Sequence, residues 1–284
     1  MVIKIVDLYK EFHFPRPEGA EGWLTCYIAR SPSSMEPARR RGGVLILPGG
    51  GYAYTSEREG EPVALRYLGK GLQAFVLSYS CAPAVFPTAL REAAMAMVYI
   101  RDHARELGVA PEKIAAVGFS AGGHLCGCLG TMFDCPEVAD IAPAAQIRPD
   151  VLGLHYPVGI SWGRTHRGSF RNISGGDTVL ASRLSLEKRV RPDMPPAFLW
   201  HTREDASVPC RSSLLLAAAM EEAGVPFALH LYHRGPHGLS LGDETVYRAG
   251  CVPEISPDVP TWLDAEVAFF KECGLNTEDL EENV

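Results

Sequence analysis

The sequence predicts an α/β fold in which a mostly parallel, eight-stranded sheet carries helices on both faces. Short apolar runs alternate with amphipathic, helix-like segments, which is the pattern of strand–helix–strand units. A serine stands between two glycines directly after one apolar run, and an acid and a histidine follow two later runs. With 284 residues, 46% of them hydrophobic, the chain can bury one substantial core, so we expect a single domain over residues 1–284.

The composition limits the classes of partner. The net charge of -7 argues against nucleic acid, because phosphate binding needs a basic face. The first eleven residues include Lys4, Asp7, Lys10 and Glu11, and no later apolar run approaches the length of a membrane span. We therefore expect a cytoplasmic protein that binds neither nucleic acid nor a membrane.

The eight cysteines are expected to be reduced thiols, because the chain is neither short nor visibly secreted. Cys126 and Cys128 would point to different faces of one helix, and His124 beside them is expected to be a packing residue. The sequence therefore predicts no metal site.

Two antiparallel edge strands are expected first. Residues 3–8 and 23–29 alternate apolar and polar side chains, and the stretch 15–22 between them indicates a turn. Residues 31–43 contain the run Arg39-Arg40-Arg41, which we interpret as part of a solvated loop because polybasic patches usually need longer runs.

The remaining strands are expected to be parallel and buried, because their apolar runs are nearly continuous. These strands are residues 44–47, 73–79, 113–117, 151–154, 197–201 and 227–232. The helices are recognised by helical spacing of apolar residues and by proline or glycine at their ends. They are expected at residues 62–69, 88–107, 212–223 and 262–273, with one more that starts directly after Ser120.

Residues 155–195 are the least regular part of the chain, with only a short helix expected around residues 184–190. A long excursion after a strand of a parallel sheet lies at the carboxyl edge, where loops carry function, so we interpret this segment as a small cap. A loop that covers one sheet edge is the alternative. The acidic end, residues 275–284, is expected to be a mobile tail.

The segment around Ser120 predicts a nucleophile elbow. Ser120 stands between Gly118 and Gly122 in the pattern G-x-S-x-G, and these glycines lack the Cβ atoms that would clash at a sharp strand-to-helix turn. The turn would place the hydroxyl at the N-terminus of a helix, where free N–H groups favour developing negative charge. Ser120 is therefore the candidate nucleophile.

Asp205 follows the seventh expected strand and His237 follows the eighth, so the chain order is Ser, Asp, His, as in α/β-hydrolases. His237 would accept the proton of Ser120, and Asp205 would hold the imidazole in the required tautomer. Glu204 is the alternative acid, although it should point to another side of the loop. His233 is the alternative base, but His237 stands between glycines after the last strand.

The run Pro48-Gly49-Gly50-Gly51-Tyr52 follows a buried strand, and no Gly-Lys-Ser/Thr follows it, so it is not a phosphate loop. Glycines allow close approach of backbone amides, and we expect the amides of Gly50, Gly51 and Ala121 to bind the oxyanion. Tyr52 and Trp162 are candidate substrate-binding rings that would stack on a sugar or line an acyl pocket, with a core or interface role as the alternative.

Four motifs in this order resemble those of the acetyl esterase and acetyl-xylan esterase-like branch of the α/β-hydrolases, which is related to the hormone-sensitive lipase group. The resemblance covers about residues 43–270, and it implies hydrolysis of short acyl esters, often acetyl groups on sugars, without a cofactor. Where the hormone-sensitive lipase group has His-Gly-Gly-Gly, this sequence has Pro48-Gly-Gly-Gly, so the glycine amide that faces the oxyanion stays open. The motifs are Leu47-Pro-Gly-Gly-Gly-Tyr52, Gly118-Phe-Ser-Ala-Gly-Gly123, His201-Thr-Arg-Glu-Asp-Ala-Ser-Val-Pro209 and Gly235-Pro-His-Gly-Leu239.

The leading hypothesis is a serine esterase that removes acetyl or similarly short acyl groups from a small-molecule or oligosaccharide ester. An amide hydrolase, such as a formamidase or small peptidase, is the alternative enzyme, because ester and amide hydrolysis share the acyl-enzyme route. A non-catalytic binding protein on a hydrolase scaffold is disfavoured, since no member of the expected triad is missing. The resemblance leaves a homo-oligomer open.

Overall fold

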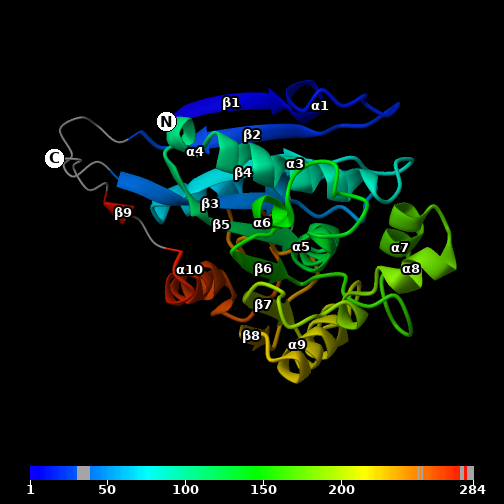
Figure 1. Ribbon diagram of the computed structural model, residues 1–284. Helices are drawn as coiled ribbons and strands as arrows, with labels where there is room; N and C mark the ends of the chain where they lie inside the picture. The colour runs from blue at the N-terminus through cyan, green and yellow to red at the C-terminus, as the bar shows by residue number, and fades with distance from the viewer. Residues whose placement is uncertain (31–38, 248–249, 251, 276–277, 280–284) are drawn as a thin grey trace.

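Eight strands form the main sheet of the computed structural model, which describes residues 1–30, 39–247, 250, 252–275 and 278–279. The strands are β1 (Val2–Asp7), β2 (Trp23–Ile28), β3 (Arg39–Leu47), β4 (Gln73–Ser78), β5 (Val109–Phe119), β6 (Val151–His155), β7 (Ala197–Thr202) and β8 (Phe227–Tyr232). Their order across the sheet is β1-β2-β4-β3-β5-β6-β7-β8 (Figure 1). β2 is antiparallel to both β1 and β4, and the other neighbours are parallel. The predicted fold class is confirmed.

Helices cover both faces of this sheet. Successive residues of a strand point to opposite sides, so a continuous apolar run places apolar side chains on both faces, and each face has to be covered. Leu45 and Leu47 of β3 pack on the face covered by α3, α5 and α9, whereas Val44 and Ile46 pack on the face covered by α2 and α10. The α-helices of the described chain are α1 (Leu8–Glu11), α2 (Glu61–Gly69), α3 (Thr88–Asp102), α4 (Ala104–Leu107), α5 (Ala121–Met132), α6 (Ala144–Ile147), α7 (Arg167–Ser174), α8 (Thr178–Arg183), α9 (Arg211–Ala223) and α10 (Trp262–Glu272).

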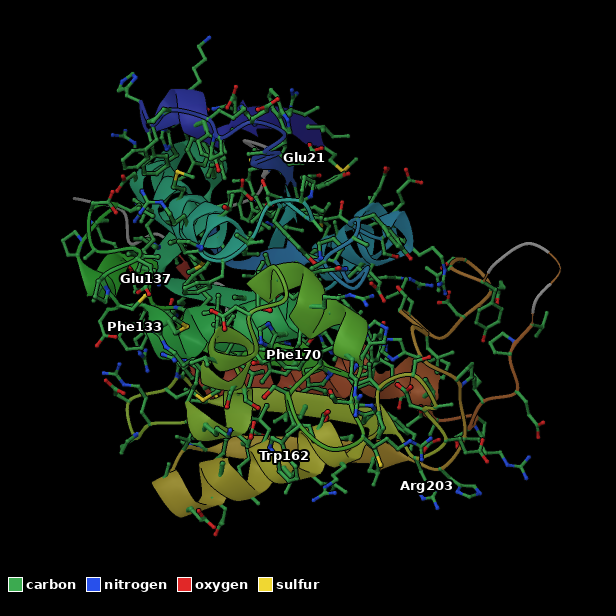
Figure 2. All side chains as sticks on the ribbon, turned by 90° about the vertical axis from the view of Figure 1, so that its right-hand side faces the viewer. Glu21, Phe133, Glu137, Trp162, Phe170 and Arg203 are labelled. Carbon is green, nitrogen blue, oxygen red and sulfur yellow. The ribbon has the colours of Figure 1, made fainter. Side chains whose placement is uncertain are left out.

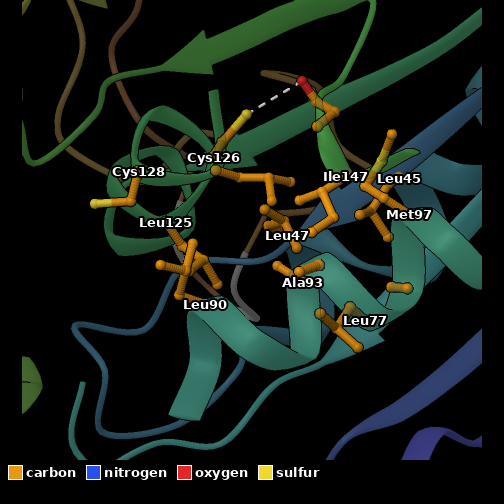
Figure 3. Packing of buried hydrophobic residues seen from close by; sticks show 14 of the residues in the cluster. Leu45, Leu47, Leu77, Leu90, Ala93, Met97, Leu125, Cys126, Cys128 and Ile147 are labelled. Carbon is orange, nitrogen blue, oxygen red and sulfur yellow. Dashed lines mark hydrogen bonds between the residues drawn. The ribbon is translucent and has the colours of Figure 1, made fainter. Parts of the chain in front are cut away.

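The contact between the sheet and α5 is close, and it fixes the direction of the helix that follows Ser120. Figure 3 shows side chains of the sheet, α3 and α5 interlocked in one cluster, including Leu47, Met97 and Leu125. Cys126 lies in the same cluster, and its thiol donates a hydrogen bond to the carbonyl oxygen of Ala116, 3.2 Å away (Figure 3). Both cysteines of the helix are thus core residues with free thiols.

Several predicted boundaries are corrected. The basic run 39–41 belongs to β3 and not to a loop, because Arg39 and Arg40 pair with the short strand β9 (Glu278–Asp279) and Arg41 pairs with Val109 of β5. Residues 31–38 of the predicted loop lie outside the described residues. The helix expected over residues 88–107 is divided into α3 and α4, although Gly108 ends it as predicted, with a φ of 65°.

The segment between β6 and β7 contains α7, α8 and a 3-10 turn, η2 (Leu186–Lys188). The helix expected around residues 184–190 is therefore wrong, because only this single turn forms there. In Figure 1, α7 and α8 lie at one end of the molecule, apart from the helices that cover the sheet. Both helices belong to residues 155–195, the segment for which the sequence predicts a small cap, and we use the name cap for this segment.

Among the described helices, none combines the length and the apolar character that crossing a bilayer requires. Of the predicted mobile tail, Leu275 is buried and residues 278–279 form β9, whereas residues 276–277 and 280–284 lie outside the described chain. The mobility of that tail stays a prediction.

Candidate active site

Ser120 lies at the sharp turn between β5 and α5, with a φ of 54° and a ψ of -113°, a backbone conformation that is strained for a residue with a Cβ atom. The flanking glycines are required sterically. A Cβ at Gly118 would lie 2.1 Å from the carbonyl oxygen of Gly122, and a Cβ at Gly122 would lie 2.0 Å from that of Leu47. The Ser120 amide donates to the carbonyl oxygen of His155 at 2.9 Å, which ties the turn to β6.

The structure brings the three predicted residues into one hydrogen-bonded chain. Ser120 Oγ lies 2.7 Å from Nε2 of His237, and Nδ1 of His237 lies 2.5 Å from Oδ2 of Asp205. Asp205 follows β7 and His237 follows β8, so neighbouring parallel strands deliver both side chains to the same edge of the sheet. The alternatives, Glu204 and His233, are exposed to solvent.

Four donors surround the Asp205 carboxylate. Oδ1 accepts hydrogen bonds from the amides of Ser207 and Val208, at 2.9 Å and 2.8 Å, while Oδ2 contacts His237 and, at 3.3 Å, Nε2 of His201. Burial would raise the pKa of Asp205, but the hydrogen bonds from His201 and His237 outweigh it and hold the pKa well below its ordinary value. Asp205 is therefore ionised at neutral pH and fixed in orientation.

The glycine turn after β3 lies beside Ser120. Gly50 and Gly51 have φ values of 128° and 66°, in the region that favours glycine, and a Cβ at Gly50 would lie 1.9 Å from the carbonyl oxygen of Tyr54. No acceptor for either amide occurs among the described residues. Ala121 is the first residue of α5, so its amide also lacks an acceptor within the helix. These amides can serve an anion in the cleft.

A cavity of about 520 Å³ opens at this place, and the glycine turn, the His237 loop and the cap all contribute to its walls. Ser120, Gly50 and Gly51 line it. Sequence reasoning missed several other residues of the wall, namely Tyr54, Arg58, Glu59, His166 and Tyr247. Only the position of Tyr54, shortly after the glycine run, could have indicated one of them.

The two aromatic residues predicted to bind substrate lie elsewhere. Tyr52 is 2% exposed, and its hydroxyl donates to Nδ1 of His124 at 2.7 Å, so it has the alternative core role. Trp162, labelled in Figure 2, is 42% exposed. Its Nε1 donates to Glu187 at 2.7 Å, and the Arg211 guanidinium lies 4.9 Å from its ring centre. Neither ring is among the residues that line this cavity. The burial of Tyr52 contradicts its predicted substrate-binding role, whereas substrate binding by the exposed Trp162 stays a prediction.

His124 is a packing residue, as the sequence predicts. Its Nε2 donates to the carbonyl oxygen of Leu184 at 2.7 Å, so Nδ1 is the acceptor for Tyr52. Burial lowers the pKa of His124 to about 4. Within the described ranges, no group of three or more histidine, cysteine, aspartate or glutamate side chains is arranged to hold a metal ion.

Comparison with known proteins gives the family. The model of the Prolyl oligopeptidase family matches residues 97–250, more than half of the chain, and the BD-FAE model matches residues 36–142. The chain belongs to the prolyl oligopeptidase family of α/β-hydrolases. The crystal structure of an acetyl ester-xyloside bifunctional hydrolase from Caldicellulosiruptor lactoaceticus is similar to this α/β-hydrolase, with a TM-score of 0.82 and 33% identity over 96% of this chain and 97% of that one.

Two curated relatives confirm the resemblance to the acetyl-xylan esterase-like branch. Endo-1,4-beta-xylanase B of Butyrivibrio fibrisolvens is 37% identical over 220 residues, which are 73% of this α/β-hydrolase and 34% of the xylanase. An acetylxylan esterase of Xylanibacter ruminicola is 26% identical over 263 residues, which are 89% of this chain and 50% of that esterase. The chain thus spans half or less of the length of these curated relatives. The comparisons place this α/β-hydrolase among carboxylic ester hydrolases.

Proposed function

We propose that this α/β-hydrolase is a serine esterase that hydrolyses short-chain acyl esters, chiefly acetyl esters on carbohydrates. The observation that carries the proposal is the hydrogen-bonded chain from Asp205 through His237 to Ser120, which ends at a cleft with free backbone amides. The names of the relatives, an acetylxylan esterase and an acetyl ester-xyloside hydrolase, support the acetyl and carbohydrate parts.

In the proposed mechanism, Ser120 Oγ attacks the acyl carbonyl carbon while Nε2 of His237 takes the hydroxyl proton. Asp205 stabilises the imidazolium that forms. The carbonyl oxygen becomes an oxyanion held by the Ala121 amide and by an amide of the glycine turn, and one such donor is worth on the order of 3 kcal/mol. His237 then protonates the departing alcohol. A water molecule attacks the acyl-enzyme by the same route and releases the carboxylic acid.

His166 offers a hydrogen-bond donor for the alcohol half of the substrate. Its Nδ1 accepts from the Ser169 amide at 3.3 Å and lies 2.8 Å from the Ser169 hydroxyl. Burial lowers the pKa of His166, so the ring is neutral at neutral pH, and with Nδ1 accepting, the proton resides on Nε2. A cleft-lining N–H suits a sugar hydroxyl or ester oxygen, and Tyr54, 58% exposed on the same cleft, offers a ring for sugar stacking.

Hydrolysis of an amide is the second candidate function. The observation that favours it is the match of residues 97–250 to a family named for a peptidase. The proposed acyl-enzyme route would serve both substrate classes, so the substrate panel must contain an amide.

The test is kcat/KM for p-nitrophenyl acetate, butyrate and octanoate, for p-nitroacetanilide, and for acetate release from acetylated xylo-oligosaccharides. We expect acetate to be preferred steeply, acetate to be released from the sugar, and Ser120→Ala to lower the rates by several orders of magnitude. Cleavage of the anilide with little ester hydrolysis would favour the second candidate. Equal rates for wild type and Ser120→Ala would overturn the proposed nucleophile.

A further inference from the structure

Glu59 is a buried carboxylate at the wall of the proposed catalytic cleft. Glu59 is the last residue of the 3-10 turn η1 (Glu57–Glu59), and it is only 3% exposed although it contributes to the wall of the cleft. The neighbouring guanidinium of Arg58 does not pair with it, because Arg58 donates instead to the carbonyl oxygens of Gly238 and Val246. A buried carboxylate is costly unless it is well hydrogen-bonded, so its partners indicate its role.

The first partner is the glycine turn. Oε2 of Glu59 accepts a hydrogen bond from the amide of Gly49 at 2.7 Å, directly before the two amides proposed to face the oxyanion. The space is tight, since a Cβ at Gly49 would lie 2.7 Å from Oε2 of Glu59 and 3.0 Å from Cβ of Ser120. On the other side, the carbonyl oxygen of Pro48 accepts from the Tyr79 hydroxyl at 2.6 Å. The peptide between Pro48 and Gly49, at the start of the turn, is therefore fixed from both sides, by Tyr79 at its carbonyl oxygen and by Glu59 at its amide.

The second partner leads to the loop that carries the proposed base. Oε1 of Glu59 accepts from the hydroxyl of Tyr156 at 2.6 Å, and that hydroxyl accepts from the amide of Ser240 at 2.9 Å. The Tyr156 ring also lies edge-on to His237, with ring centres 5.1 Å apart. The Ser240 hydroxyl donates back to the carbonyl oxygen of Arg58 at 2.7 Å. One carboxylate thus connects the glycine turn with the His237 loop.

We propose that Glu59 is a positioning residue that holds the oxyanion-binding turn and the His237 loop in register with Ser120. This inference rests on the proposed esterase function. A carboxylate accepts from both sides at once, which glutamine cannot do, because an amide oxygen that accepts from Gly49 leaves the NH2 group facing the Tyr156 hydroxyl. Glu59→Gln therefore loosens the amides of the glycine turn and the His237 loop, whose placement matters most when the oxyanion forms.

Glu92 provides a matched control for Glu59→Gln. Glu92 is fully buried in α3 and accepts from a tyrosine hydroxyl and a backbone amide, those of Tyr9 at 2.8 Å and Ser80 at 2.6 Å, but it does not line the cleft. Both variants would be compared with wild type in Tm, in kcat and KM for p-nitrophenyl acetate, and in affinity for an alkylboronic acid, which forms a tetrahedral adduct with the serine. If Glu59→Gln does not fold, Tyr156→Phe replaces it in the test. This variant removes the hydroxyl that links Glu59 to the His237 loop and leaves the bond from Gly49 to Glu59 in place.

We expect Glu59→Gln to lower kcat at least about 10-fold and to weaken boronate binding in parallel, with KM within about 3-fold. Glu92→Gln should lower Tm but leave kcat within about 3-fold, and Tyr156→Phe should lower kcat with KM unchanged. Equal kcat in the two glutamine variants, or a Glu59→Gln defect confined to KM, overturns the positioning role while wild-type hydrolysis upholds the esterase. A wild type that hydrolyses no ester overturns the esterase function, and the proposal with it.

Discussion

Asp205→Asn is the sharpest perturbation of the proposed mechanism, because the surrounding donors fix how an amide would sit. The amides of Ser207 and Val208 both donate to Oδ1, so the carbonyl oxygen of an asparagine would occupy that position. Its NH2 group would then face Nδ1 of His237. The imidazole must accept at Nδ1, which moves its proton to Nε2, and it can no longer take the proton of Ser120.

The expected loss follows from this change of tautomer. The fold keeps two of the hydrogen bonds at the position, so the variant should fold and bind substrate. Loss of the correctly oriented base is expected to lower kcat about 10⁴-fold, which corresponds to about 5 kcal/mol of transition-state stabilisation. KM should change little, because the carboxylate of Asp205 does not line the cleft.

The assay is p-nitrophenyl acetate hydrolysis by wild type, Asp205→Asn and the matched control Glu204→Gln. Glu204 is the adjacent, exposed carboxylate, so its replacement should leave kcat within about 2-fold. Retention of more than a tenth of the wild-type kcat by Asp205→Asn would refute the reasoning. An equal loss of kcat in Glu204→Gln would contradict the assignment of Asp205 as the acid of the triad.

Three further predictions concern the elbow, acid stability and metals. Gly122→Ala should destabilise the protein by about 3 kcal/mol or more and lower Tm by roughly 6 °C, because its Cβ would lie 2.0 Å from a carbonyl oxygen; Gly69→Ala, where a Cβ meets nothing within 4 Å, should not lower Tm. Folding lowers the pKa of His124 from its ordinary value to about 4, so at acidic pH the imidazole is protonated in the unfolded chain before it is protonated in the folded one. The free energy of unfolding should therefore drop by about 3 kcal/mol as the pH falls from 6.5 to 4. Urea titrations across that range should show a flatter pH dependence for His124→Gln, and an unchanged slope would contradict the assignment. EDTA should leave ester hydrolysis intact, and an inhibition that zinc reverses would contradict this.

The sheet could be predicted because its strands are short apolar runs, and the positions of Ser120, Asp205 and His237 followed from their places after particular strands. The extent of β3 could not, because Arg39 and Arg40 join the strand only through pairing with residues far along the chain. Hydrophobic periodicity carries no information about such a partner.

The walls of the cleft were predictable only in part. Tyr52 was misassigned because its backbone takes a φ of 58°, and its ring packs in the core instead of lining the cleft beside Gly51. Glu59 and His166 carry no motif of their own. Burial beside Tyr156, which comes from a distant segment, distinguishes Glu59, and a place in the wall of the cleft distinguishes His166. Such residues become visible only when the fold brings the segments together.

The chain between β6 and β7 connects two adjacent parallel strands, and none of Ser120, Asp205 and His237 lies within it. The start of the connection cannot be exchanged, because the Tyr156 hydroxyl donates to Glu59 and the Val158 amide donates to the carbonyl oxygen of Ser120. Replacing only the part after Val158 keeps these contacts and the strand registers, while it exchanges the side of the cleft that His166 lines. The requirement is that anchors such as Ile173 and Leu186, which pack into the main core, are kept. Under the proposed function, this side of the cleft and the three residues of the proposed triad therefore lie in separate stretches of the sequence, so one can diverge while the other is preserved.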